Sequence, residues 1–127
     1  MTSYDWLIIA VLAALQVKHF LFDFVLQRPY EFFKNKGTYG HPGGIVHAGL
    51  HAIGTIPAIL IMPPSLAVGI AIVVGEFIIH YHIDWSKEQI ERRWKTSSAN
   101  HFMILGLDQL AHQMTYVLIL GVLMASS

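Results

Sequence analysis

The stretch LAVGIAIVVGEFIIHYHI, residues 66–83, decides the fold of this chain. Its length is close to the ~20 apolar residues that a helix needs to cross a bilayer core. Three other apolar runs are of similar length, at residues 6–26, 45–62 and 102–124. Pro57 is expected to kink the second helix. Because a helix satisfies its own backbone hydrogen bonds within lipid, the sequence predicts an all-α integral membrane protein, a bundle of four transmembrane helices.

The overall composition also points to the lipid bilayer as the main partner of the chain. Of 127 residues, 54% are hydrophobic and 13% are charged, whereas about a quarter of the residues in a soluble domain are charged. The formal net charge is zero, so no basic surface indicates a nucleic-acid partner. The chain has no cysteine, which excludes disulfides and thiolate metal sites.

Basic residues gather in two of the segments that connect the apolar runs. The terminal segments and the connection at residues 63–65 carry no lysine or arginine. The positive-inside rule therefore places the loops at residues 28–44 and 85–100 in the cytoplasm and both termini on the outer side. The basic residues of these loops are Arg28, Lys34, Lys36, Lys87, Arg92, Arg93 and Lys95.

Polar residues within the apolar runs recur at an offset of 61 residues. The pairs that coincide are His19 with His80, Asp23 with Asp84, His47 with Asp108, and His51 with His112. This pattern predicts a single membrane domain over residues 1–127 that consists of two parallel helical-hairpin repeats, at about residues 4–62 and 65–124. Such repeats are related by an axis along the membrane normal.

The eight repeated residues are expected to share one depth and one interior. Each helix carries two of them at i, i+4 spacing, which places both on the same face. Counted inward from the basic loops at about 1.5 Å per residue, all of them lie in the cytoplasmic half of the bilayer. Ionisable side chains within a membrane turn away from lipid, so we expect these faces to meet at the centre of the bundle.

The residue types suggest a divalent metal as cofactor. Imidazole and carboxylate together are the ligand set of zinc, manganese and iron. Facing helices that carry such pairs one turn apart are also how helical bundles hold two-metal sites. We therefore predict a buried metal site formed by the eight repeated residues. A proton relay and a structural polar core stay open as alternatives for the same residues.

Two charged residues depart from the repeat, because Glu76 aligns with Leu15 and Lys18 aligns with Ile79. Glu76 is a candidate catalytic residue, as a general base that acts on a metal-bound water. Lys18 is a second candidate, since it could neutralise a negative substrate or pair with a carboxylate. Alternatively, the long Lys18 side chain extends toward the membrane interface and has no role in a site.

Four segments carry a family resemblance. They are KHFLFDFVLQ at residues 18–27, HAGLHAIG at 47–54, IDWSK at 83–87 and LDQLAHQ at 107–113. The chain resembles an uncharacterised domain-of-unknown-function family of small, polytopic inner-membrane proteins of bacteria and phages. The resemblance implies a multi-pass protein of the bacterial inner membrane and implies no reaction. With the orientation from the positive-inside rule, both termini are then expected in the periplasm. A looser similarity to membrane-bound metal-dependent hydrolases rests on residue type alone and is an analogy.

Three functions fit these observations. The favoured one is a metal-dependent hydrolase of a membrane-surface substrate, since the predicted site is shallow enough to meet a lipid headgroup. The second is a transporter or sensor of metal ions or protons, although the outer half of the spans offers few polar side chains for a path. The third is a small accessory subunit of a larger membrane complex, with a structural polar core. A homodimer is compatible with each of them.

Overall fold

The structure is a computed structural model and describes residues 2–26, 35–94 and 97–126. Within these residues helices are joined by turns and short connections, and there is no strand. The helices are α1 (Ser3–Phe20), the π-helix η1 (Leu21–Val25), α3 (Pro42–Gly54), α4 (Ile56–Ile61), α5 (Leu66–Arg93) and α6 (Ser98–Ala125). Four segments are long and apolar enough to cross a membrane: Ser3–Val25, Pro42–Ile61, Leu66–Arg93 and Ser98–Ala125. The predicted all-helical fold with four helices able to span a membrane is therefore confirmed.

Helix α5 is longer than the sequence predicted. It continues through Arg93, and α6 begins at Ser98, so most of the expected loop at residues 85–100 is helix. That expectation was wrong because hydropathy marks only the apolar part of a helix. Residues 84–93 are rich in lysine, glutamate, glutamine and arginine, which favour helix, and contain no glycine or proline to end it.

The other expected loop, at residues 28–44, is described from residue 35 onward, and residues 28–34 lie outside the described part. Residues 35–41 form turns that lead into α3. Gly40 has a φ of 77°, a backbone conformation that glycine adopts without strain. Its N–H donates to the Tyr81 hydroxyl on α5 at 2.6 Å, which fixes this segment against the bundle.

Two of the four spans are interrupted near polar residues. The first changes from α-helix to π-helix at Leu21, so Asp23 lies in a wider turn. Such π-helical turns are frequently found at functional sites. The second span breaks at Thr55, between α3 and α4. The predicted kink at Pro57 thus takes the form of a break, because proline has no N–H to continue the helical hydrogen bonds.

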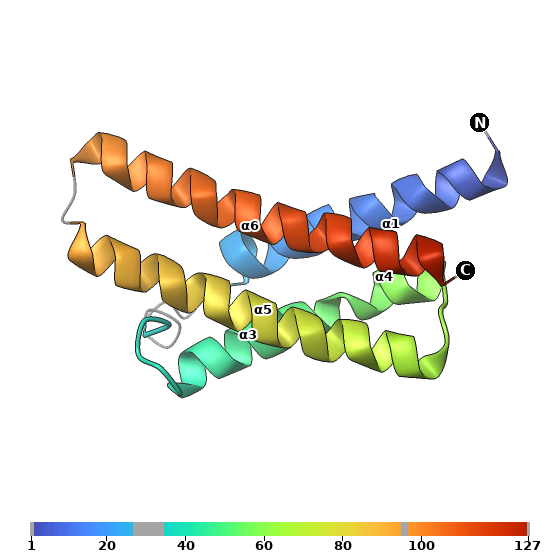
Figure 1. The fold of residues 1–127 in the computed structure, drawn as a ribbon, viewed down its shortest axis with the longest axis horizontal. Coiled ribbons are helices and arrows are strands. Elements are labelled where there is room, and N and C mark those ends of the chain that lie inside the picture. The colour runs from blue at the N-terminus through green and yellow to red at the C-terminus, as the bar shows by residue number, and fades with distance from the viewer. Residues whose placement is uncertain (1, 27–34, 95–96, 127) are drawn as a thin grey trace.

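The helices form an elongated bundle in which both chain termini lie at the same end (Figure 1). The 35–41 segment, the C-terminal end of α5 and the N-terminal end of α6 lie at the opposite end, which we call the loop end. The half of the bundle near the termini contains an apolar core. Its buried residues are Val11, Leu15, Ala58, Met62, Ile72, Tyr116, Ile119 and Leu123. Polar side chains are buried in the half toward the loop end, so the bundle has an apolar and a polar half.

Candidate metal centre

The eight repeated residues lie in the polar half of the bundle and come from all four spans. They are His19 and Asp23 from α1 and η1, His47 and His51 from α3, His80 and Asp84 from α5, and Asp108 and His112 from α6. Seven of them are buried, and the side chain of Asp23 is 11% exposed. Contacts of 2.9–3.5 Å between ring nitrogens and carboxylate oxygens join all eight into one group, here called the His/Asp cluster.

The first part of the cluster is centred on Asp23. Its Oδ1 lies 2.9 Å from His47 Nε2 and 3.1 Å from His51 Nε2. The His80 ring stacks on the His51 ring with 3.8 Å between centroids. Each of these four residues offers one ligand atom, and the four atoms lie within 4.8 Å of one another. This group combines three imidazoles with one carboxylate, as zinc and other transition metals prefer.

The second part is centred on Asp84 and shares His80 with the first. Asp84 Oδ2 lies 3.5 Å from His80 Nε2, and Asp84 Oδ1 lies 3.4 Å from His112 Nε2. One ligand atom from each of these three residues again falls within 4.8 Å of the others. His80 thus belongs to both groups, and its ring centroid is 4.3 Å from that of His112.

Several polar atoms of the cluster are buried without a hydrogen bond among the described residues. Both ring nitrogens of His80 are in this state, as are His112 Nε2 and Asp108 Oδ1. A buried polar group that lacks a hydrogen bond costs about 1–3 kcal/mol. A divalent cation would use the nitrogen lone pairs and would also supply positive charge to the carboxylates. The donor set therefore fits a metal ion better than a closed hydrogen-bond network.

His19 and Asp108 stand outside both ligand groups and contact members of them. His19 Nδ1 lies 3.2 Å from Asp23 Oδ2, and the Tyr116 hydroxyl is hydrogen-bonded to the same nitrogen at 2.9 Å. Asp108 Oδ1 lies 3.5 Å from His112 Nε2. Residues in such positions orient metal ligands and tune their basicity.

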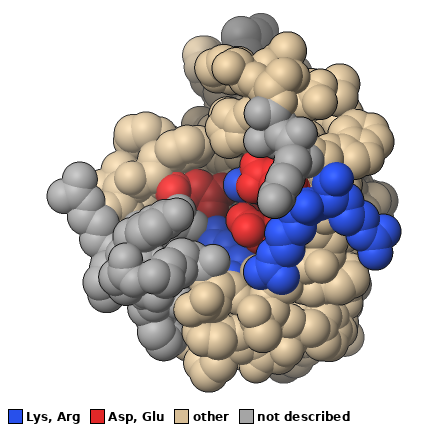
Figure 2. Space-filling view, turned by 90° about the vertical axis from the view of Figure 1, so that its left-hand side faces the viewer, with Lys and Arg blue, Asp and Glu red and all other residues tan. Residues whose placement is uncertain are grey.

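The cluster approaches the surface at the loop end. Figure 2 shows that acidic side chains lie in a central hollow at this end, with lysine and arginine side chains beside them. Lys36, from the 35–41 segment, places its Nζ 2.9 Å from Asp84 Oδ2. A cationic side chain therefore contacts a carboxylate of one of the two ligand groups.

A comparison with protein families assigns the chain. The model of the family described as "Protein of unknown function (DUF3307)" matches residues 11–127. The chain belongs to the DUF3307 family. The match includes all eight residues of the cluster, and the resemblance inferred from the four sequence segments is confirmed. Neither a curated protein nor a solved structure matches the chain significantly, so the comparisons add no reaction to the DUF3307 description.

The two residues that break the repeat meet each other in this DUF3307 protein. Lys18 Nζ forms an ion pair with the Glu76 carboxylate. It also donates hydrogen bonds to Thr55 Oγ1 at 2.8 Å and to the His51 carbonyl at 2.9 Å. Both side chains of the pair are almost fully buried, at 5% and 1% exposure. Of the two interpretations of Lys18, pairing with a carboxylate is thus observed and extension to the interface is not.

Several residues that contact the cluster or the ion pair were not foreseen, among them Thr55, Tyr116, Lys36 and Gln109, whose Oε1 lies 2.8 Å from His19 Nε2. Thr55 and Tyr116 follow His51 and His112 by four residues, so each polar stripe continues for one more helical turn. That spacing was a usable signal. Lys36 had no such signal, because its contact with an aspartate depends on how an irregular segment folds back onto α5.

Proposed function

We propose that the His/Asp cluster binds a divalent metal and that the protein is a metal-dependent hydrolase acting at the membrane surface. The observation that carries this proposal is His80, whose two ring nitrogens are buried and make no hydrogen bond with any described residue. It lies where imidazoles and carboxylates from all four spans converge. The 3.5 Å contact of His80 Nε2 with Asp84 Oδ2 is longer than a good hydrogen bond. A buried imidazole without hydrogen bonds is costly in such a place, and a metal ligand is not.

Hydrolysis fits the surroundings of the cluster. The hollow at the loop end supports access from the membrane surface (Figure 2). The cluster contains no serine, and the chain contains no cysteine, so a covalent nucleophile of either type is lacking there. A bound divalent ion would supply an activated water and would polarise an ester or phosphate group. The surrounding imidazoles and carboxylates would orient the ion and accept protons.

Transport fits less well than hydrolysis. Beyond the Lys18–Glu76 pair, the interior of the terminal half is filled by the apolar core that includes Leu15, Ile72 and Leu123. A conducting path needs polar groups or water along its length. Zinc or proton flux into liposomes that disappears in Asp108→Asn would favour transport over hydrolysis. A purely structural polar core is also disfavoured, since it would leave polar atoms buried without partners.

The proposal also includes the orientation of the bundle in the membrane and the 61-residue internal repeat. We place the loop end in the cytoplasm of a bacterial inner membrane, on the basis of the lysines and arginines there, and both termini in the periplasm. Equivalent contacts in the two halves support the 61-residue repeat. The Asp23–His51 contact of 3.1 Å corresponds to the Asp84–His112 contact of 3.4 Å.

The predicted catalytic roles of Lys18 and Glu76 are revised in this proposal. Glu76 is held by Lys18 and by Thr55, whose Oγ1 lies 2.9 Å from Glu76 Oε2. Both residues lie on the terminal side of the cluster, away from the hollow. Because Lys18 also donates to the His51 carbonyl, the pair acts as a positioning element for α3.

The proposal is tested by metal content and hydrolysis together. Detergent-purified protein should contain one or two zinc, manganese or iron ions per chain by elemental analysis. Vesicles made from a bacterial inner-membrane lipid extract are then incubated with the protein, and mass spectrometry follows the released headgroups, phosphate and fatty acids. We expect product that is lost after chelation and restored by the metal. Product formation that persists in fully metal-free protein, or metal-loaded protein that forms no product, would overturn the proposal.

A further prediction concerns Lys36. Its ammonium contacts Asp84 at 2.9 Å and should compete with a cation for that carboxylate. Lys36→Met is therefore expected to raise metal affinity roughly tenfold. This gain corresponds to only a fraction of the Coulomb energy of the contact, because the flexible lysine of the wild type can move aside when an ion binds. Competition with a fluorescent zinc chelator measures the change. Lys87→Met, which removes the same charge without a direct contact to Asp84, is the control. Weaker binding by Lys36→Met would mean that Lys36 supports the metal site.

A further inference from the structure

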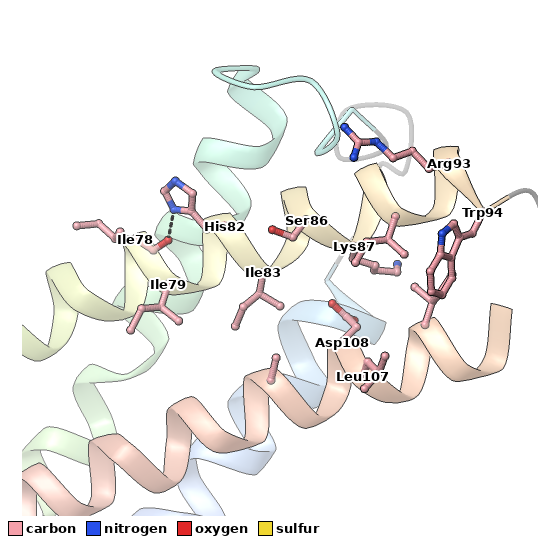
Figure 3. Close-up of a pocket in the computed structure, with 13 residues that line it drawn as sticks. Ile78, Ile79, His82, Ile83, Ser86, Lys87, Arg93, Trp94, Leu107 and Asp108 are labelled. Carbon is pink, nitrogen blue, oxygen red and sulfur yellow. Dashed lines mark hydrogen bonds between the residues drawn. The ribbon is translucent and has the colours of Figure 1, made fainter. Parts of the chain in front are cut away.

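A second feature of the structure points to what the metal centre acts on. A groove with a volume of about 670 Å³ runs between α5 and α6 and opens on the outer surface of the bundle (Figure 3). Apolar side chains form most of its walls, among them Ile79, Ile83 and Leu107. Leu107 is 56% exposed although it lies within a membrane span. The groove therefore faces lipid rather than another part of the described chain.

The length of the groove matches one leaflet of a bilayer. Along α5 the lining extends from Ile78 to Trp94. The part from Ile78 to Lys87 rises about 14 Å at 1.5 Å per residue, close to half of the ~30 Å hydrocarbon core. The remaining part, toward Trp94, falls at headgroup depth, where tryptophan is typically found.

The cationic side chains of the groove lie at its headgroup end, and the Asp108 carboxylate lines the α6 wall near Lys87. Lys87 and Arg93 both line that end, with Lys87 on the side of α6 and the Arg93 guanidinium directed away from α6 (Figure 3). Lys87 Nζ is 3.9 Å from Glu88 Oε1, a loose contact on the surface of α5. Two cations at the end of an apolar groove complement an amphiphile with an anionic head and a hydrocarbon tail. They disfavour a second copy of the chain in the groove, since a symmetric dimer would bring the same cations together.

One side chain connects this groove with the metal centre. Asp108 lines the groove and also contacts His112 Nε2 at 3.5 Å. It is 8% exposed, and its Oδ1 has no hydrogen-bond partner among the described residues. In Figure 3 it lies in the space between the two helices, below Lys87. A headgroup held by Lys87 would thus be adjacent to the cluster.

We propose that the α5–α6 groove takes up a phospholipid with an anionic headgroup directly from the bilayer and presents its phosphate to the metal centre. An acyl chain lies along Ile79, Ile83 and Leu107, the phosphate contacts Lys87 next to Asp108, and Arg93 attracts the anionic headgroup from farther along α5. This inference rests on the proposed hydrolase function and names its substrate class. The bilayer supplies the substrate, so no water-soluble carrier is needed.

The test measures lipid binding separately from hydrolysis. The full-length protein is reconstituted in vesicles that contain a photoactivatable phosphatidylglycerol or, in parallel, a photoactivatable phosphatidylcholine. Cross-linked peptides are then mapped by mass spectrometry. We expect labelling of the Ile83 and Leu107 segments that is stronger with the anionic lipid. The double variant Lys87→Gln/Arg93→Gln should bind phosphatidylglycerol roughly 25-fold more weakly, from about 1 kcal/mol for each cation.

Arg92→Gln provides the matched control, because Arg92 is exposed on the same helix and does not line the groove. It should bind phosphatidylglycerol like the wild type, and all variants should keep the same metal content. Labelling that shows no preference for the anionic lipid, or that persists unchanged in the double variant, would overturn the inference. Cross-links between the grooves of two copies of the chain, in place of cross-links to lipid, would also overturn the inference. Selective binding without any hydrolysis would instead overturn the proposed reaction and leave the groove as a lipid site.

Discussion

His80→Ala is expected to remove bound metal almost completely, whereas His82→Ala is expected to retain it. His80 belongs to both ligand groups, so one substitution takes a ligand from each. Loss of a residue that only orients a ligand lowers metal affinity about 10- to 100-fold, and loss of a shared direct ligand should cost at least about 100-fold. His82 lies on the same helix but is exposed, and its Nδ1 is hydrogen-bonded to the Ile78 carbonyl at 2.7 Å.

Elemental analysis and chelator competition on detergent-purified protein measure this difference. Alanine leaves a cavity at a position that is 2% exposed, so His80→Gln serves as a second variant of closer volume that also lacks the imidazole. Thermal unfolding shows whether each variant is folded before its metal is counted. A folded His80→Gln protein with the metal content and affinity of the wild type would contradict the assignment of His80 as a ligand.

His19→Ala should give a smaller effect than the His80 variants. His19 contacts Asp23 but belongs to neither ligand group. An orienting role predicts a loss of affinity within the 10- to 100-fold range. A larger loss of metal affinity for the His80 variants than for His19→Ala would distinguish residues that bind the ion from residues that orient its ligands. Equal losses at both positions would mean that the two groups are not the ligand sets inferred from the geometry.

The membrane spans could be predicted from the sequence because hydropathy depends on local composition alone. The same measure failed for the end of α5, where residues 84–93 are helical but polar. The i, i+4 spacing of His80 and Asp84 also predicted a shared face, since that relation is fixed by the geometry of one helix. These successes concern properties that a single segment determines.

Contacts between side chains of different helices could not be predicted from these local sequence patterns. Asp23 contacts two histidines of α3, at 2.9 and 3.1 Å, and this depends on how α1 and α3 are rotated and offset. The π-helical turn at Leu21–Val25 changes that rotation locally, and no sequence rule indicated it. The same limit applies to Lys18 and Glu76. Their departure from the repeat was visible, but their contact with each other was not.

The Lys18–Glu76 ion pair gives the second large expected effect. Lys18→Ile and Glu76→Leu should each lower the free energy of unfolding by about 3–5 kcal/mol, because each leaves one buried charge without its counter-ion. The double variant should recover most of this loss, since it removes both charges together. Its two new residues are those at the aligned positions in the other half, Ile79 and Leu15. Unfolding in mixed detergent micelles measures all three proteins against the wild type.

The double variant also decides what the pair does for the site, because it is expected to be stable enough to assay. A positioning role predicts that Lys18→Ile/Glu76→Leu keeps its metal and loses only part of its hydrolysis, through a displaced His51 carbonyl. A general base at Glu76 predicts full metal content with hydrolysis abolished, and Glu76→Gln should then be equally inactive. A double variant less stable than either single variant would contradict the ion pair itself. The asymmetry between the two halves of the bundle can therefore be assigned to stability, position or chemistry by comparing these variants with the wild type.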